Sequence, residues 1–540
     1  MKNILIALLI FNISNSFSQE TFIRKDSLQG GLRPERTNFD VLRYELNIKI
    51  DIEKKYIVGY NDIFFTITTK KINQIQIDLF DNMQVDSIVH INKKLNYKRD
   101  NNAVFIDFPN YLFNKSENNI RFYYSGNLII AKNAPWDGGF VFKKDSNNKD
   151  FVGVACQGTG ASLWFPCKDS QSDEPDQGAK INITIPDGLT AVSNGRLLGT
   201  NQANEGFTTW NWQVTNPINS YGITLNIGDY VHFGENYKGL DLDYYVLREN
   251  EAKAKVQFEQ VKPMMDCFQD KFGPYPFKTD GYKLVETSYL GMEHQSAVAY
   301  GNKYQNGYLG TDLSQTGIGN LFDFIIIHES GHEWFGNSIT SKDIADMWIH
   351  EGFTSYSEAV FVECLYGSQK AQQYLNGTFN NIKNDKPIIG KFGVNAEGSS
   401  DMYNKGALLL NNLRHTINDD FRWWRILYKY CDFFRHKIID TQMVIRFFNQ
   451  ESGMNLTPIF NQYLKHKELP VLEIKIVKKK LEYKWIANVE NFDMPIDVKY
   501  KDEIIRLKPT TKTQTAEFTI KKMKQLEVLN EKLYFNWIKN

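Results

Sequence analysis

The chain has 540 residues, of which 42% are hydrophobic and 14% aromatic. This length and composition predict two to four domains with apolar cores and exclude a disordered chain. The 63 basic and 63 acidic residues balance, and no long run of one sign is present. We therefore expect neither nucleic acid nor an anionic membrane surface as a partner.

Residues 1–18 have the three parts of a signal peptide. Lys2 supplies the positive charge, residues 4–10 form a short apolar run, and Ser16-Phe17-Ser18 is a small-x-small cleavage site. The alternative is an amphipathic or buried first helix. The apolar run is too short to span a membrane. We expect no membrane span, and we predict a periplasmic or secreted protein.

Residues 19–37 are polar and predict a loose lead-in, whereas residues 38–232 predict an all-β sandwich. Every second residue between Tyr44 and Ile50 is apolar, which is the period of a half-buried strand. Similar runs, such as Ile181–Ile185, are followed by turn signals such as Pro186-Asp187-Gly188. Short strands with such regular punctuation are typical of a sandwich.

Residues 233–468 predict a second domain that mixes strands with helices. Ala252–Phe272 has the pattern of a helix that ends at a Gly-Pro pair, and residues 404–466 are mostly helical. Alternation returns after Pro470, so residues 469–540 predict a small β domain.

The motif that organises the chain is His328-Glu329-Ser330-Gly331-His332. Residues four apart lie on the same face of a helix, so His328 and His332 can bind one metal ion. Glu329 lies beside them and can act as a general base toward a metal-activated water. The alternative is an ordinary buried helix that carries two histidines by chance.

Glu351 is the candidate for a third ligand. It lies 19 residues after His332, which leaves room for a second helix to pack antiparallel against the first. Its neighbours are apolar or aromatic, and an unpaired carboxylate is costly there. Two histidines, one glutamate and an open position describe catalytic zinc, so we predict one Zn²⁺ per chain. Glu358, two turns further along, is either a partner that orients a ligand histidine or an ordinary surface charge.

With these residues in view, the chain resembles the aminopeptidase N-like family of zinc aminopeptidases, which are gluzincins. The resemblance extends from about residue 40 to about residue 500. Further segments that match the family are Trp334-Phe335-Gly336-Asn337, Trp348-x-x-Glu351-Gly352-Phe353, Phe272-Gly273-Pro274-Tyr275-Pro276, Trp164-Phe165-Pro166-Cys167, Asp173-Glu174-Pro175-Asp176 and Tyr403-Asn404-Lys405-Gly406-Ala407.

The resemblance implies roles for residues that spacing alone leaves unassigned. Gly291-Met292-Glu293 matches the family's G-x-M-E-N segment, whose glutamate binds the free α-amine of the substrate. Gln157 matches a Glu or Gln that helps to hold the same amine. Tyr403 matches the tyrosine that donates a hydrogen bond to the oxyanion. The chain departs from the motif at Leu290 and His294, which puts the shape of the neighbouring pocket in doubt.

These features together predict a zinc-dependent aminopeptidase that hydrolyses the first peptide bond of peptides with a free N-terminus. The expected fold is multidomain: an N-terminal sandwich, a thermolysin-like α+β catalytic domain with a helical extension, and a small C-terminal β domain. A thermolysin-like zinc endopeptidase and a non-catalytic zinc-binding scaffold are the alternatives.

We expect a monomer or a weak homo-oligomer. Relatives often carry a large helical domain at the C-terminus, so we expect this site to be more open or covered by another subunit.

The five cysteines include no CxxC pair and do not predict a disulfide framework. One bridge, between Cys156 and Cys167, is one interpretation. Buried free thiols are the other.

Overall fold

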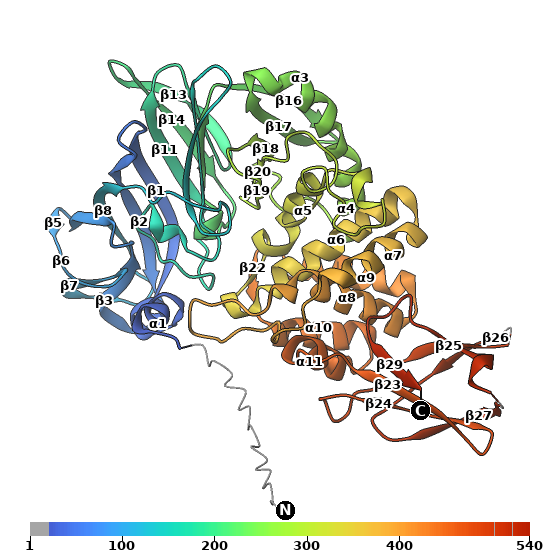
Figure 1. Cartoon of the computed structure of the whole chain (residues 1–540). Coiled ribbons are helices and arrows are strands. Elements are labelled where there is room, and N and C mark those ends of the chain that lie inside the picture. The colour runs from blue at the N-terminus through green and yellow to red at the C-terminus, as the bar shows by residue number, and fades with distance from the viewer. Residues whose placement is uncertain (1–20, 502, 521, 540) are drawn as a thin grey trace, which may run out of the picture.

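The computed structural model describes residues 21–501, 503–520 and 522–539. Strands dominate the first part of the chain, helices the middle, and strands return at the end (Figure 1). This order confirms the predicted fold class, in which a β-rich N-terminal domain precedes a central domain of helices and a smaller number of strands, followed by a β-rich C-terminal region. The predicted signal peptide lies outside the described residues.

The N-terminal domain is built from three sheets around one core. Strand β1 (Phe39–Asp51) lies in the middle of the largest sheet, antiparallel to β2 (Tyr56–Ile67) and parallel to β11 (Ala179–Pro186). The alternating apolar residues of β1 are at most 3% exposed, so the period of two marks the core face.

In spatial order, the largest sheet contains β13 (Arg196–Asn204), β14 (Phe207–Val214), β11, β1, β2, β8 (Glu117–Asn127), β4 (Met83–His90) and β5 (Lys93–Lys94). The second sheet contains β12 (Thr190–Ser193), β15 (Leu225–Gly228), β10 (Asp150–Ala155) and β9 (Gly139–Lys144), and the third contains β3 (Lys71–Asp78), β7 (Ala103–Phe113) and β6 (Asn96–Asp100).

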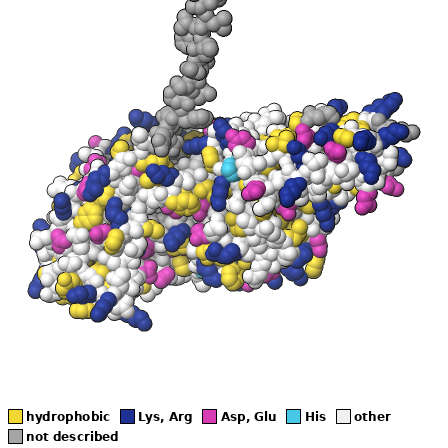
Figure 2. Space-filling model, turned by 90° about the horizontal axis from the view of Figure 1, so that it is seen from below, with side chains coloured by type: hydrophobic (Ala, Val, Ile, Leu, Met, Phe, Trp, Pro, Cys, Tyr) yellow, Lys and Arg dark blue, Asp and Glu magenta, His cyan; other side chains and the backbone are white. Residues whose placement is uncertain are grey.

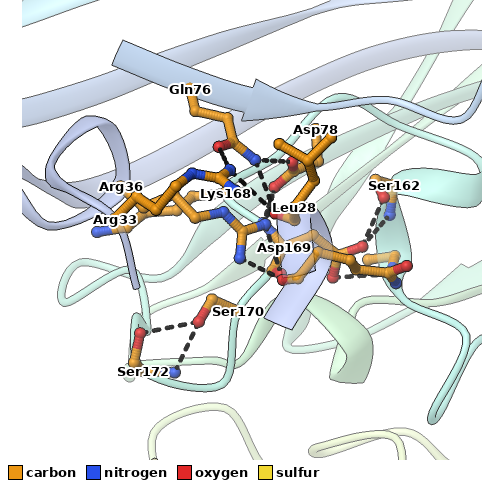
Figure 3. A network of polar contacts seen from close by, with 12 residues as sticks. Leu28, Arg33, Arg36, Gln76, Asp78, Ser162, Lys168, Asp169, Ser170 and Ser172 are labelled. Atoms are coloured by element: carbon orange, nitrogen blue, oxygen red, sulfur yellow. Dashed lines mark hydrogen bonds and ion pairs between the residues drawn. The ribbon is translucent and has the colours of Figure 1, made fainter. Parts of the chain in front are cut away.

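The polar lead-in is not loose, which corrects the prediction. It forms α1 (Arg24–Gly30) and α2 (Pro34–Thr37), and Arg36 is completely buried. The guanidinium of Arg36 pairs with the carboxylate of Asp78 and donates a 3.0 Å hydrogen bond to the Asp169 carbonyl (Figure 3). The arginines of this segment bind polar groups of the β domain. The polar residues of the lead-in therefore hold it against that domain and do not mark a segment surrounded by solvent.

The central domain begins with a sheet whose strand order is β16 (Tyr230–Tyr237), β17 (Leu240–Leu247), β18 (Tyr282–Glu286), β20 (Val298–Tyr300) and β19 (Gly291–Met292). The predicted boundary at residue 232 therefore falls inside β16. One strand follows another across this junction, so the hydrophobic period contains no break that could mark the boundary.

Helices make up most of the rest of the central domain, and α3 (Glu251–Gln257) and α4 (Val261–Phe272) share a buried cluster with this sheet (Figure 1). The later α-helices of this domain are α5 (Phe324–Gly331), α6 (Trp348–Tyr366), α7 (Ser368–Gly377), α8 (Asn404–Ile417), α9 (Asp420–Phe433), α10 (Thr441–Ser452) and α11 (Thr457–Lys465). A short parallel pair, β21 (Ile339–Ser341) and β22 (Lys437–Ile439), ties the region after α5 to the segment before α10.

The C-terminal region contains two small sheets that share a buried cluster with the central helices. Asn411 of α8, for example, donates a 2.9 Å hydrogen bond to the carbonyl of Lys532. One sheet contains β27 (Gln514–Thr519), β24 (Lys480–Ile486), β23 (Val471–Val477) and β29 (Asn536–Lys539), and the other contains β26 (Glu503–Leu507), β25 (Ile496–Tyr500) and β28 (Leu526–Leu529).

A disulfide joins Cys267 of α4 to Cys364 of α6. Cys156, Cys167 and Cys431 are buried free thiols, so the bridge that the sequence left open between Cys156 and Cys167 is not formed. The two bonded residues are 97 positions apart, and only the packing of α4 on α6 brings them together.

Basic and acidic side chains are interspersed over the face shown in Figure 2, as the balanced composition predicts. Within the described part of the chain, none of the helices is both long enough and apolar enough to cross a membrane.

Candidate active site

Helix α5 contains His328, and His332 is the C-cap residue directly after its last turn. Asp323 caps its start, because its carboxylate accepts hydrogen bonds from the amides of Ile325 and Ile326. One turn later, the Nε2 atoms of His328 and His332 lie 3.3 Å apart. Both side chains are buried.

The structure brings Glu351, at the start of α6, to the same point. Its Oε2 atom lies 3.6 Å from Nε2 of His328 and 3.3 Å from Nε2 of His332. A tetrahedral zinc ion with ligand bonds of about 2.0–2.2 Å separates its ligand atoms by about 3.3–3.6 Å. The three atoms therefore have the spacing of a zinc shell.

The hydrogen bonds of the histidines show that a cation fits here. Nδ1 of His328 lies 2.6 Å from the Glu358 carboxylate, and Nδ1 of His332 lies 2.9 Å from the Phe335 carbonyl. Since both acceptors bind Nδ1–H, each imidazole in its neutral form presents the lone pair of Nε2 to a metal. These lone pairs face Glu351 Oε2, which is buried and accepts no hydrogen bond from the described residues. Two imidazole nitrogens and a carboxylate oxygen that converge in this way fit a metal cation.

Further residues hold the histidines in this orientation. The hydroxyl of Tyr374 donates a 2.6 Å hydrogen bond to the second oxygen of Glu358. Glu358 is buried, so of its two interpretations the structure favours the partner of a ligand histidine. Gly336 has a φ of 122°, and a Cβ there would lie 3.2 Å from Nδ1 of His332. A side chain at this position would be strained and would crowd the ring.

Glu329 lies beside the three ligand atoms and also lines the cavity above them, which measures about 230 Å³. Burial raises the pKa of its carboxyl to about 7, which suits a general base near neutral pH. The backbone of β19 passes closely over it: a Cβ on Gly291 would lie 2.9 Å from Glu329 Oε1 and 2.8 Å from Ile325. Only glycine fits at position 291, because any larger residue would bring its Cβ too close to Glu329 and Ile325.

Glu293 and Gln157 meet in the same cavity, close to the ligand residues. Gln157 follows β10 of the N-terminal domain, and its Nε2 donates hydrogen bonds to Glu293 Oε1 and, at 3.2 Å, to Glu351 Oε1. Burial raises the pKa of the Glu293 carboxyl. Met292 is buried with the core of the N-terminal domain. This packing fixes the end of β19, and the apolar side chain of Met292 offers the cavity no polar group.

Tyr403 closes the cavity just before α8. Its ring stacks on the His328 imidazole with centroids 6.1 Å apart. Burial raises the pKa of its hydroxyl, so the hydroxyl remains a proton donor at neutral pH. The structure thus brings together all the predicted site residues around one cavity, with Gly291 and Met292 as the backbone that carries Glu293.

Two nearby histidines are not ligands. Nε2 of His350 accepts a 2.8 Å hydrogen bond from the Ser341 amide. His294, at the position where the family motif has Asn, is completely buried, and neither ring nitrogen has a hydrogen-bond partner among the described residues. Burial lowers the pKa of both imidazoles to about 3.

Sequence reasoning missed two residues of the site, Trp136 and Glu397. Trp136 lines the cavity that holds the predicted ligands, and Glu397 lines the cavity next to it. Neither belongs to a motif with metal or catalytic spacing, and both reach the site only through tertiary packing.

The comparisons with known proteins agree with this geometry. Residues 41–221 match the peptidase M1 N-terminal domain, and residues 256–463 match the peptidase family M1 domain. The chain belongs to the M1 peptidase family.

Particular relatives are distant in sequence. Endoplasmic reticulum aminopeptidase 1 of Mus musculus is 26% identical over 280 residues, which are 48% of this chain and 29% of that protein. Aminopeptidase B of Mus musculus is 26% identical over 317 residues, which are 56% of this chain and 46% of that protein. The chain spans less than half the length of either relative.

Solved structures share the fold. An M1 zinc metallopeptidase from Deinococcus radiodurans has a TM-score of 0.67 and 18% identity, and the match covers 82% of this chain and 95% of that one. A mutant of the same enzyme, with the same TM-score, is bound to a Tyr-Ser-Ala substrate.

Proposed function

We propose that this protein is a zinc-dependent aminopeptidase that removes single residues from peptides with a free N-terminus. The observation that carries the proposal is the contact of Gln157 with both Glu293 and the ligand Glu351. This contact puts a carboxylate for the peptide ammonium at a fixed, short distance from the ligand atoms. A peptide whose ammonium binds Glu293 then has its first peptide bond at the metal position.

The residues that would hold zinc are His328, His332 and Glu351. When bound there, zinc acts as a Lewis acid toward the scissile carbonyl and lowers the pKa of water. Glu329 accepts the proton of the attacking water and later delivers it to the leaving amine. Tyr403 donates a hydrogen bond to the oxygen that gains negative charge.

Glu293 binds the ammonium of the substrate and Gln157 orients the carboxylate by its hydrogen bond. A buried carboxylate that faces a desolvated ammonium is favourable when both charges are present and costly when one is missing. This asymmetry favours free N-termini over blocked ones. It also supports the exopeptidase over the thermolysin-like endopeptidase, whose cleft must admit peptide on both sides of the metal.

The comparisons give further support. Both mouse relatives are named aminopeptidases, and the Deinococcus radiodurans neighbour is an M1 zinc metallopeptidase with a peptide substrate bound in one structure. A zinc-binding scaffold has no use for Glu329 and Tyr403, so their presence beside the ligands favours catalysis.

We also propose that the protein is exported to the periplasm or the exterior and acts as a monomer or weak homo-oligomer. The Cys267–Cys364 disulfide supports export, because such bonds persist in oxidising compartments. The signal-peptide pattern of residues 1–18 agrees with this location.

The test is hydrolysis of aminoacyl-coumarin reporters by the purified protein before and after chelation. We expect chelation to abolish hydrolysis and added zinc to restore it. A His332→Ala variant should contain far less than one zinc per chain by elemental analysis. A variant that keeps a full equivalent of zinc, or wild-type turnover that is indifferent to chelation, would overturn the proposal.

A further inference from the structure

A second cavity adjoins the cavity of the ligand atoms and measures about 280 Å³. The two share four wall residues, which are Pro135, Trp136, Gln157 and Tyr403. The loop after α7 forms the far side of the second cavity, where Asn395, Ala396 and Glu397 line it.

The position of this cavity indicates which part of a substrate it receives, and this step rests on the proposed function. In an N-terminal residue, the Cα atom lies between the ammonium and the carbonyl. The ammonium end is at Gln157 and Glu293, and the carbonyl end is at Tyr403. Gln157 and Tyr403 both line the second cavity as well as the first, so the second cavity adjoins that Cα atom and is open to its side chain.

Glu397 gives this cavity its charge. A Cβ on Gly158 would lie 3.4 Å from Glu397 Oε1, so the carboxylate lies directly over the loop that carries Gln157. Burial and, to a smaller extent, the neighbouring charges of Glu351 and Glu293 together raise the pKa of the Glu397 carboxyl to about 7, and Lys386 acts in the opposite direction. The negative charges near Glu397 outnumber the positive ones, so the cavity has an acidic character.

The other carboxylates of the site already have a task. Glu358 binds His328, Glu351 belongs to the ligand set, and Glu329 and Glu293 act on water and ammonium in the proposed function. Glu397 has no part in that chemistry.

The loop that carries Glu397 is fixed on both sides. Nδ2 of Asn395 donates a 3.0 Å hydrogen bond to the Gly158 carbonyl, and the Asn395 amide donates a 3.2 Å hydrogen bond to the Asp26 carbonyl of α1. The docked lead-in and the Gln157 loop therefore hold Glu397 in place before a substrate arrives, which lowers the entropy cost of binding.

We propose that Glu397 binds the cationic side chain of an N-terminal arginine or lysine and makes the enzyme selective for basic first residues. Trp136, which is 68% exposed, lines the same cavity, and an indole ring can bind a guanidinium or ammonium by a cation–π contact. Arginine and lysine carry their charge at the end of a long side chain, and Glu397 lies in the wall of the cavity that this side chain would enter.

The first test compares arginyl-coumarin with citrullyl-coumarin, because citrulline has nearly the shape of arginine without the charge. We expect wild-type kcat/KM to favour arginine by about tenfold to a hundredfold, the value of a hydrogen-bonded charge in a desolvated site. In Glu397→Gln the ratio should fall to about one. Glu205→Gln, which removes an exposed carboxylate from the turn between β13 and β14, is the matched control and should keep the wild-type ratio.

A ratio near one in the wild type would overturn the proposal. So would a Glu397→Gln variant in which both substrates slow by the same factor, since that result describes a structural role.

The second test does not depend on turnover. Calorimetric titration of Glu329→Gln protein with L-arginine and L-citrulline should show the same preference, and the added Glu397→Gln change should abolish it. If arginine binds selectively while no reporter is hydrolysed by the wild type, the proposed function fails and the basic subsite stands. Equal binding of the two amino acids would remove the subsite and leave the proposed function untouched.

Discussion

The two walls of the active-site cavity are built in different ways. The metal-side wall consists of His328, Glu329, His332, Glu351 and Glu358, which belong to the helices α5 and α6 or, for His332, to the residue directly after α5. The recognition wall consists of Gln157, Glu293, Glu397 and Tyr403, which come from both large domains and from separate loops. The first wall follows from helix spacing, whereas the second exists only when the domains pack. Metal binding is therefore a local property of the sequence, and peptide recognition is a property of the whole fold.

The largest effect should come from the metal-side wall. Glu329→Gln keeps the shape of the side chain but removes the base, so we expect kcat to fall by about 10²–10⁴-fold. Zinc content, measured by elemental analysis, should remain one per chain because Glu329 is not among the ligands. Turnover close to that of the wild type would show that another group takes the proton.

The corresponding change in the recognition wall is Tyr403→Phe. Loss of one hydrogen-bond donor to a developing oxyanion lowers kcat by about 10²–10³-fold. The effect should appear in kcat and only weakly in KM, because the hydrogen bond forms in the transition state. A variant that changes KM alone would place Tyr403 in ground-state binding.

A smaller effect should come from Glu358, which is not a ligand but holds the ligand His328 in orientation. Glu358→Gln leaves the three ligand atoms in place but weakens the hydrogen bond to His328, so zinc affinity should fall by about 10–100-fold. Competition with a calibrated chelator measures it. Unchanged affinity would mean that Glu358 does not orient the ring.

The smallest effect concerns stability at His294, which follows Glu293 of the recognition wall in the sequence. The buried imidazole of His294 has a pKa lowered to about 3, against about 6.5 in an unfolded chain. The unfolded state therefore takes up the proton first, and stability falls as the pH drops below about 6.5. At pH 5 this costs about 2 kcal/mol.

His294→Asn should remove that cost. Urea unfolding at pH 7.5 and pH 5 should show a smaller loss of stability in the variant than in the wild type. The same loss in both proteins would contradict the buried, neutral state of His294.

The same contrast between the two walls explains what the sequence could predict. The spacing of His328, His332 and Glu351 depends on helix geometry, which a linear pattern contains. Gln157 and Tyr403 were assigned only through the resemblance to relatives, because no local pattern links them to the metal. Glu397 was missed, since its loop reaches the site through contacts with α1 and with the Gln157 loop.

The lead-in and the disulfide were misjudged for a related reason. A polar segment can be solvated or can bind buried carboxylates, and only the packed β domain, with Asp78 in place for Arg36, decides between them. Cysteine counts likewise contain no information about which helices pack, and it is the contact of α4 with α6 that pairs Cys267 with Cys364.

The most direct test of the two-wall account uses one short peptide with a free and with an acetylated N-terminus. Mass spectrometry should show that the free peptide loses residues one at a time from its N-terminus. The acetylated peptide leaves Glu293 buried without an ammonium, so its kcat/KM should be lower by about two to three orders of magnitude. Glu293→Ala should slow the free peptide and keep one zinc per chain. Equal rates for the free and acetylated peptides would contradict the account and favour an endopeptidase.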